Sequence, residues 1–192
     1  MKSGWNIRNV LVLLAALSLA TPWASASSAD NGQPVQKTRD YGKYEARLIK
    51  QVRHELLMLP YYSVFDNLAF QVEGDKVTLI GQVVRPTLKS DAEGAVKKIE
   101  GVAKVVNGIE ILPVSFNDDR LRRALYRSIY GNAVLQHYGV GSNRPIHIIV
   151  KNGHATLEGV VDREMDRNVA NIQANSVPGV FSVTNHLRVE KS

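Results

Sequence analysis

The chain has 192 residues, of which 44% are hydrophobic and 22% are charged, and its formal net charge is +6. This length suits one large domain or two small ones, and the composition excludes a wholly disordered chain. Because the sequence has no cysteine, it excludes disulfides, thiolate catalysis, cysteine-bound zinc, iron–sulfur clusters and an acylated N-terminal cysteine.

Residues 1–26 have the pattern of an export signal. Two basic residues precede an apolar run from Val10 to Ala20, and the small residues Ala24 and Ala26 follow it. The alternative is an uncleaved membrane anchor, but at about 1.5 Å per residue this run is too short to cross a bilayer core of about 30 Å. We therefore predict a signal peptide that is cleaved after Ala26, and a protein located in the periplasm.

Residues 27–42 are mostly polar, with few apolar groups, and we predict that they form a flexible tether. Removing residues 1–26 removes two basic residues and no acid, which leaves a net charge of +4. This mildly basic balance is not by itself typical of a nucleic-acid-binding protein. An exported protein also does not meet the chromosome, so we expect no nucleic-acid partner.

The rest of the chain consists of two tandem copies of one sequence unit, with copy one at residues 43–112 and copy two at residues 118–191. The stretch Val77–Gly81 corresponds to Ala155–Gly159 at an offset of 78 residues, and this offset continues without a gap. Such self-similarity is typical of duplicated domains. The same offset pairs identical residues in the two copies, among them Gly81 with Gly159, Gly101 with Gly179 and Asn107 with Asn185.

Each copy is predicted to run helix, strand, strand, helix, strand. In copy one, Leu48, Val52 and Leu56 recur at helical spacing. Gly74-Asp75 predicts a tight hairpin between two strands, and Asn152-Gly153 repeats it in copy two. The expected fold class is α+β, with two tandem αββαβ domains, each a three-stranded mixed sheet covered on one face by two helices.

The repeated glycines and asparagines are expected to serve the fold. Gly81 and its counterpart Gly159 are expected to end a strand where the chain turns toward a helix, and Gly101, like its counterpart, is expected to cap a helix. Asn107 and Asn185 stand among inward-facing apolar residues, where the side-chain amide can satisfy nearby backbone groups. The alternative for the asparagines is a ligand-binding role.

These motifs resemble the tandem BON-domain family of osmotically inducible periplasmic proteins and dual-BON lipoproteins. The resemblance is carried by Val77–Gly81 with Gly101–Ile111, and again by Ala155–Gly159 with Gly179–Val189. It implies αββαβ units in the bacterial envelope that bind phospholipid surfaces without catalysis or a cofactor and support envelope integrity or stress tolerance. Since no cysteine is available for acylation, the chain departs from the lipoprotein branch.

The sequence lacks the common catalytic motifs, in agreement with the non-enzymatic interpretation. The sequence contains no nucleophile elbow, P-loop or dinucleotide-binding glycine pattern. His147 and His154 flank the second hairpin and are candidates for a metal site, but no His-x-x-x-His pair exists. We interpret them as surface histidines and predict no metal. The acidic residues within 162–166 alternate with arginine and are expected to form a solvated helix start.

The unusual segment is the first helix of copy two, residues 118–130. Its apolar residues Leu121, Leu125 and Ile129 form one stripe that is expected to face the sheet. The candidate lipid-binding residues are those expected on the outer side: Arg122, Arg123, Tyr126, Arg127 and Tyr130. Arginine and tyrosine suit an anionic phospholipid interface. Alternatively, the tyrosines pack against copy one and the arginines are ordinary surface charge.

The leading hypothesis is therefore a non-enzymatic envelope protein that binds anionic phospholipid membrane surfaces peripherally. The alternative is a periplasmic protein-binding or chaperone-like module that uses an exposed sheet edge for strand addition. Lipid binding through arginines should weaken as the salt concentration rises, whereas strand addition should not.

Overall fold

The structure is a computed structural model that describes residues 34–140 and 144–190, with side chains from residue 42 onward. All of these residues belong to one compact unit. The predicted signal peptide 1–26, its cleavage-site residues Ala24 and Ala26, and residues 27–33 lie outside the described residues.

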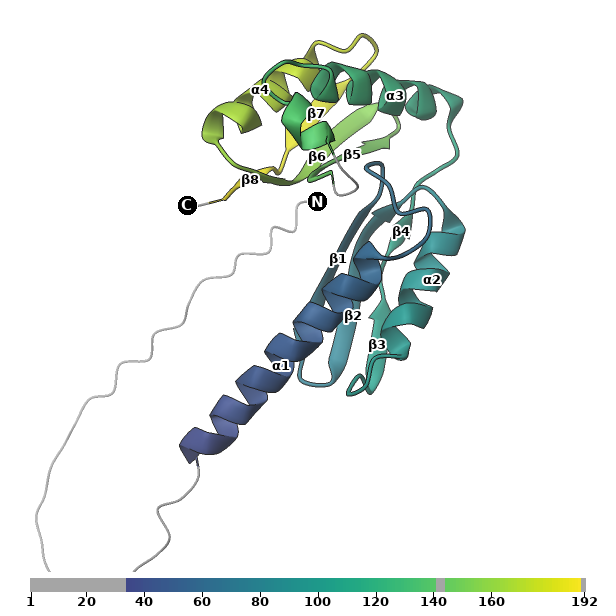
Figure 1. Cartoon of the computed structure of the whole chain (residues 1–192). Helices are drawn as coiled ribbons and strands as arrows, with labels where there is room; N and C mark the ends of the chain where they lie inside the picture. The colour runs from purple at the N-terminus through teal and green to yellow at the C-terminus, as the bar shows by residue number, and fades with distance from the viewer. Residues whose placement is uncertain (1–33, 141–143, 191–192) are drawn as a thin grey trace, which may run out of the picture. The chain divides into compact units, whose positions relative to one another are not determined.

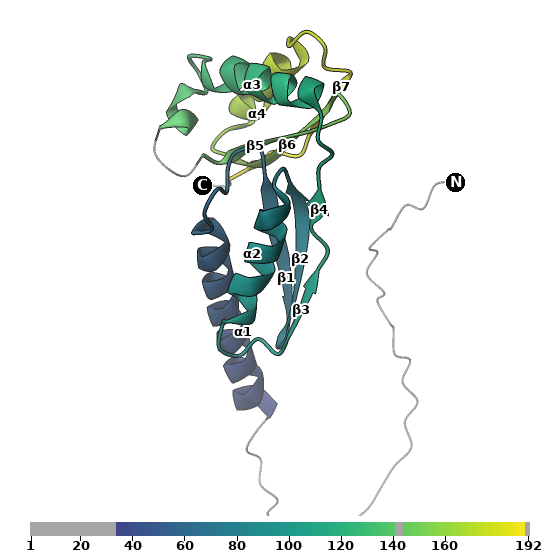
Figure 2. The same cartoon turned by 90° about the vertical axis from the view of Figure 1, so that its right-hand side faces the viewer.

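Copy one forms a mixed sheet with two helices on one face (Figures 1 and 2). β1 pairs antiparallel with β2, while β3 and β4 both pair parallel with β2 and are successive pieces of one edge strand. The elements are α1 (Pro34–Leu57), β1 (Asn67–Glu73), β2 (Lys76–Val83), α2 (Pro86–Lys97), β3 (Lys104–Asn107) and β4 (Glu110–Ile111).

Copy two repeats this order, with a short 3₁₀ helix inserted after its first helix. β5 pairs antiparallel with β6, which pairs parallel with β7 and β8. The predicted α+β fold of two tandem αββαβ domains is thus confirmed. The elements are α3 (Phe116–Tyr130), the 3₁₀ helix Gln136–Gly139, β5 (Ile146–Lys151), β6 (His154–Val161), α4 (Glu164–Asn175), β7 (Ser182–Asn185) and β8 (Arg188–Val189).

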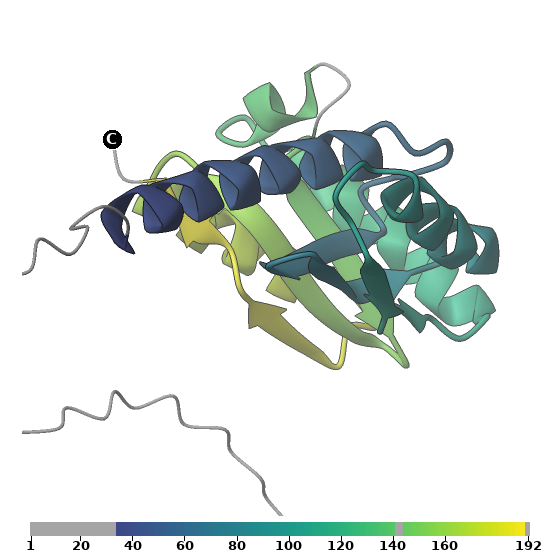
Figure 3. The same ribbon diagram turned by 90° about the horizontal axis from the view of Figure 1, so that it is seen from below.

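Helix α1 is longer than the sequence pattern predicted, and Figure 3 shows it along its length. It begins at Pro34, so the part of the expected tether 27–42 that the structure describes is helical. Proline suits a first helical turn because the N–H that it lacks has no helical partner there. Farther along the helix, the Tyr44 hydroxyl donates a 2.7 Å hydrogen bond to the carbonyl of Gly101. This bond ties α1 to the turn that follows α2.

Each copy has its own apolar core, but residues 58–66, the connector between α1 and β1, also contribute to the core of copy two. Val64 is buried in that core, and its carbonyl accepts a 2.7 Å hydrogen bond from the N–H of Ile148 in β5. The connector is held by the buried carboxylate of Asp66, which accepts from the N–H and hydroxyl of Ser63 and from the N–H of Val84. Copy one therefore covers part of the outer edge of β5.

The repeated glycines differ in detail from the expectation. Gly81 and Gly159 do not end strands but lie inside β2 and β6, with φ of +125° and +123°. A side chain there would collide with a carbonyl of the neighbouring strand, that of Asn67 or Pro145. Glycine is needed because it tolerates both the positive φ and this close approach.

Gly101 and Gly179 also serve the backbone, but neither ends its helix. They have φ of +96° and +93°. The helices α2 and α4 end earlier, at Lys97 and Asn175, and the glycines shape the turns that follow. The expectation that they cap helices is therefore wrong in position, although the need for positive φ is confirmed.

Asn107 and Asn185 satisfy backbone groups, as expected. The Asn107 amide donates to the carbonyl of Lys89 in α2, and its oxygen accepts from the N–H of Ile109, where the edge strand breaks. Asn185 makes the same two bonds, to Arg167 in α4 and from Leu187. Each asparagine thus joins the second helix of its copy to the interrupted edge strand.

Candidate lipid-binding surface

Helix α3 is fixed to copy two through its first turn. The Ser115 side chain caps it by accepting from the N–H of Asp118. The buried Asp118 carboxylate accepts from the N–H groups of Asn152 and Gly153, both at 2.8 Å. Since Asn152 and Gly153 form the β5–β6 hairpin with positive φ, this carboxylate holds the hairpin and the start of α3 together.

Arg122 does not belong to the exposed face, which corrects the prediction. Its side chain is 3% exposed, and its guanidinium donates a 2.7 Å hydrogen bond to the carbonyl of Val150 and pairs with Asp119. It lies about 60° around the helix from Leu125, which faces the sheet. This angle leaves the long side chain able to reach β5, so Arg122 is a structural residue.

Tyr130 is also buried rather than exposed. It is 7% exposed, and its hydroxyl donates a 2.6 Å hydrogen bond to the carbonyl of Ile146. Burial raises the pKa of Tyr130. Tyr126 is half-buried, with its ring 6.2 Å edge-on from that of Phe65 and the Arg144 guanidinium 5.7 Å from its centre. Phe65 belongs to the connector of copy one, so for Tyr126 the alternative of packing against copy one holds.

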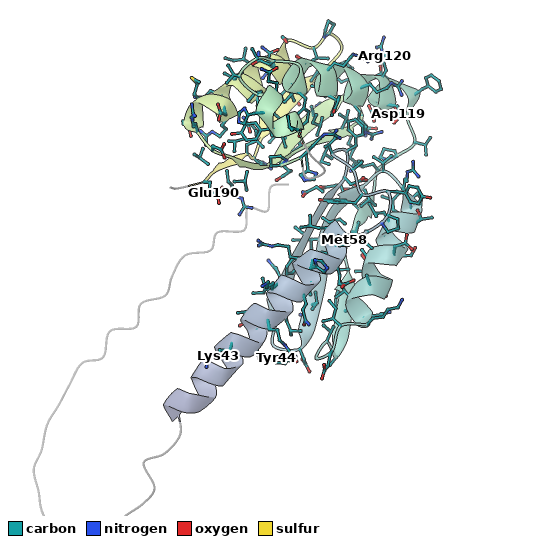
Figure 4. The ribbon with its side chains drawn as sticks, in the orientation of Figure 1. Lys43, Tyr44, Met58, Asp119, Arg120 and Glu190 are labelled. Carbon is teal, nitrogen blue, oxygen red and sulfur yellow. The ribbon has the colours of Figure 1, made fainter. Side chains whose placement is uncertain are left out.

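The exposed side of α3 carries a different set of residues, which we call the α3 stripe: Phe116, Arg120, Arg123 and Arg127. They are spaced four, three and four residues apart, on the side opposite Leu121, Leu125 and Ile129. Phe116 is 92% exposed, and the neighbouring Val114 is fully exposed. Figure 4 labels Arg120 and Asp119 near the start of the helix.

The α3 stripe retains its charge. Arg120 donates to the side-chain oxygen of Asn117 at 3.0 Å. Within the part of the chain that the structure describes, no carboxylate lies within ion-pair distance of Arg120, Arg123 or Arg127. Phe116 and Arg120 were not among the predicted residues, although their four-residue spacing to each other and their position opposite Leu125 could have indicated them.

The two histidines proposed as metal-site candidates are not brought together. His147 in β5 faces Glu158, and His154 faces Lys151 at the other end of the hairpin. Burial lowers the pKa of His147, and its ring stacks on Tyr62 at 5.6 Å. The side chain of His147 is partly buried, contrary to the expected surface position, whereas that of His154 is exposed as expected.

A different group, His137, Asp162 and Asp166, has side-chain ligand atoms within 4.8 Å of one another. The expectation that these acids are solvated is wrong for Asp166, which is buried and accepts a 2.8 Å hydrogen bond from the hydroxyl of Tyr138. The same hydroxyl accepts from the N–H of Asp162. These bonds attach the 3₁₀ helix to the start of α4.

Two tandem αββαβ copies with the same strand pairing and the same glycine and asparagine positions define a duplicated α+β protein. Residues 45–113 and 117–191 each match the BON domain, and the chain therefore belongs to the BON-domain family. BON domains are associated with phospholipid binding and with envelope and osmotic stress proteins, and they are generally non-catalytic. Among the described residues, none of the helices combines the length and apolar character needed to cross a membrane.

Solved structures that match the chain include two at 13% identity. One is from studies of CdsD, a structural protein of the type III secretion system of Chlamydia trachomatis, and covers 76% of this chain and 93% of that chain with a TM-score of 0.30. The other is the C-terminal domain of CdsD, which covers 75% of this chain and 98% of that chain with a TM-score of 0.27. No curated protein matches the chain.

Proposed function

We propose that this protein binds anionic phospholipid membrane surfaces peripherally, through the α3 stripe, and so supports envelope integrity or stress tolerance. The observation that carries the proposal is the joint exposure of Phe116 with Arg120, Arg123 and Arg127 on one side of α3. Anionic headgroups attract the guanidinium groups, and an exposed aromatic ring suits the interfacial region of a bilayer.

The expected contribution of the α3 stripe to the affinity is measurable. Each arginine near an anionic membrane contributes up to about 1 kcal/mol, so three contribute up to about a hundredfold in affinity. Removing Phe116 from water adds about 2 kcal/mol if its ring is fully buried in the interface. The first helix of copy one should attract an anionic membrane less strongly, because Glu45 and Glu55 are interspersed with its basic residues.

The location that we propose is the periplasm, reached through a signal peptide cleaved after Ala26. Its support is the sequence pattern of residues 1–26. N-terminal sequencing of the protein recovered from the periplasm should begin at Ser27, and a retained Met1 would refute the cleavage.

The strand-addition alternative meets an obstacle at one edge of copy two. The carbonyl of Val64 already accepts the N–H of Ile148 in β5. A partner strand would have to displace the connector, including the buried side chain of Val64. This observation favours the helical face over the β5 edge as the binding surface.

Vesicle flotation tests the proposal. The protein without residues 1–26 should float with vesicles that contain phosphatidylglycerol and should not float with vesicles of phosphatidylcholine alone. Replacing Arg120, Arg123 and Arg127 by serine should remove most of the binding, because the exposed charge is lost while the buried stripe is kept.

A matched control uses the exposed basic residues of α1, with Arg47, Lys50 and Arg53 replaced by serine. This variant should float nearly as well as the wild type, since nearby acids already weaken its field. The proposal would be contradicted if the wild type did not bind the vesicles at low salt, or if its binding were unchanged at high salt.

A further inference from the structure

A pocket of about 770 Å³ lies between the α1–β1 connector and the first helix and strand of copy two. Its apolar and aromatic wall includes Leu57, Met58, Phe65 and Tyr126. Figure 4 labels Met58 at the end of α1. Leu57 and Met58 are exposed although apolar, at 47% and 68%. Exposed apolar groups that converge on a hollow are typical of a binding surface.

The polar part of the pocket is cationic. Arg123, Arg127 and Arg144 line it, and none of its described lining residues is acidic. The Arg144 guanidinium lies over the ring of Tyr126, which keeps it against the wall. His147 also lines the pocket, and its Nδ1 has no hydrogen-bond partner among the described residues. Three guanidinium groups without a carboxylate are complementary to a phosphate group.

We propose that this pocket binds one molecule of a lysophospholipid, with its phosphodiester at the three arginines and its single acyl chain against the apolar wall. A pocket of about 770 Å³ lies within the range of about 300–1,000 Å³ that is typical of small-molecule sites. We therefore expect a ligand with one acyl chain rather than two.

This inference rests on the proposed function for its ligand class, anionic lipid, but it concerns a different surface. The pocket uses Met58, Phe65 and Arg144, none of which is part of the α3 stripe. Arg123 and Arg127 are shared by both surfaces, so the tests of the pocket leave them unchanged. A monomeric lipid in solution probes the pocket, and a vesicle probes the α3 stripe.

The experiment is calorimetric titration of the protein without residues 1–26 with lysophosphatidylglycerol, kept below the concentration at which it forms micelles. We expect saturable binding of one molecule per chain. Inorganic phosphate tests the headgroup alone, and a non-ionic detergent of the same chain length tests the chain alone. Both should bind at least about tenfold more weakly, because each satisfies only one part of the pocket.

Two variants locate the site. Met58→Asp places a carboxylate on the apolar wall and should weaken lysophosphatidylglycerol binding at least about tenfold, since the charge opposes both the chain and the phosphate. Its matched control is Met165→Asp, at an exposed methionine of α4 outside the pocket. Arg144→Ser should weaken binding to a smaller extent, and Arg163→Ser, at an exposed arginine before α4, should not.

The outcomes separate the pocket from the membrane surface. Vesicle flotation without binding of monomeric lysophosphatidylglycerol overturns the pocket and leaves the proposed function standing. Equal binding of phosphate, or of the detergent, also overturns the pocket as a lysophospholipid site. Loss of lipid binding in Met58→Asp, with flotation retained, supports the pocket. Equal binding by Met58→Asp and Met165→Asp overturns it.

Discussion

Replacing Arg122 by alanine is expected to destabilise copy two by about 3 kcal/mol while leaving the α3 stripe intact. The largest contribution is the buried hydrogen bond from the guanidinium to the carbonyl of Val150, which as a charge-assisted bond contributes about 1.5–3 kcal/mol. The apolar stem of the side chain adds about 1 kcal/mol of packing. The ion pair with Asp119 adds little because that carboxylate is 46% exposed.

The assay is urea unfolding followed by far-UV circular dichroism, with Arg123→Ala as the matched control on the same helix. Arg123 is exposed, so its replacement should change the free energy of unfolding by no more than about 0.5 kcal/mol. Vesicle flotation should show the reverse order, with the larger loss in Arg123→Ala under conditions in which both variants are folded. Equal stability of the two variants would refute the structural role given to Arg122.

The remaining predictions concern the backbone and one buried histidine. Gly159→Ala should cost about 1–3 kcal/mol, because of the positive φ and the collision with a neighbouring carbonyl, whereas Gly94→Ala in the open interior of α2 should stabilise by about 0.5–1 kcal/mol; chemical unfolding measures both. Asn185→Ala should cost about 1–3 kcal/mol through the unpaired backbone groups that it leaves, and an unchanged unfolding midpoint would contradict this. Because burial lowers the pKa of His147, this histidine takes up a proton more readily in the unfolded chain than in the folded one. The stability that neutral His147 contributes is therefore complete above a pH of about 6.5, and it falls as the pH drops from there toward the folded-state pKa. His147→Phe should therefore lose less stability than the wild type between pH about 7.5 and pH about 5.5, and identical losses would contradict the assignment.

The sequence predicted the fold well where the determining interactions are local or repeated. The offset of 78 residues paired glycines and asparagines whose backbone roles are the same in both copies. The helical period also placed Leu121, Leu125 and Ile129 in the core. The extent of α1 was missed because residues 34–42 lack the apolar spacing that marked the rest of the helix.

The candidate site was less predictable because the exposure of its side chains depends on partners that are distant in the sequence. Arg122 is covered because a carbonyl 28 residues away lies within reach of its guanidinium. Tyr130 is covered by the chain that returns to Ile146 after the segment inserted in copy two. A helical wheel contains neither neighbour, so it assigned both side chains to the solvent. Phe116 lies before the predicted start of the helix at residue 118, and the expected stripe therefore omitted it.

The contribution of the connector between α1 and β1 could not be anticipated for the same reason. Val64 belongs to copy one in sequence but to the core of copy two in space. No period or repeat marks such an exchange, because the second copy has no equivalent neighbour to pack against. It is this exchange that brings Phe65 to Tyr126 and forms the wall of the pocket.

The most direct test of membrane binding by the α3 stripe is fluorescence from a tryptophan placed at Phe116. The two tryptophans of the chain, Trp5 and Trp23, lie within residues 1–26, so Phe116→Trp is the only such fluorophore in the protein without that segment. With vesicles that contain phosphatidylglycerol, its emission should shift to shorter wavelength as the ring leaves water. The same replacement at Ile172, an exposed position on α4, should show no shift. A shift at Ile172→Trp alone, or at neither position while the protein floats with the vesicles, would contradict binding through this face.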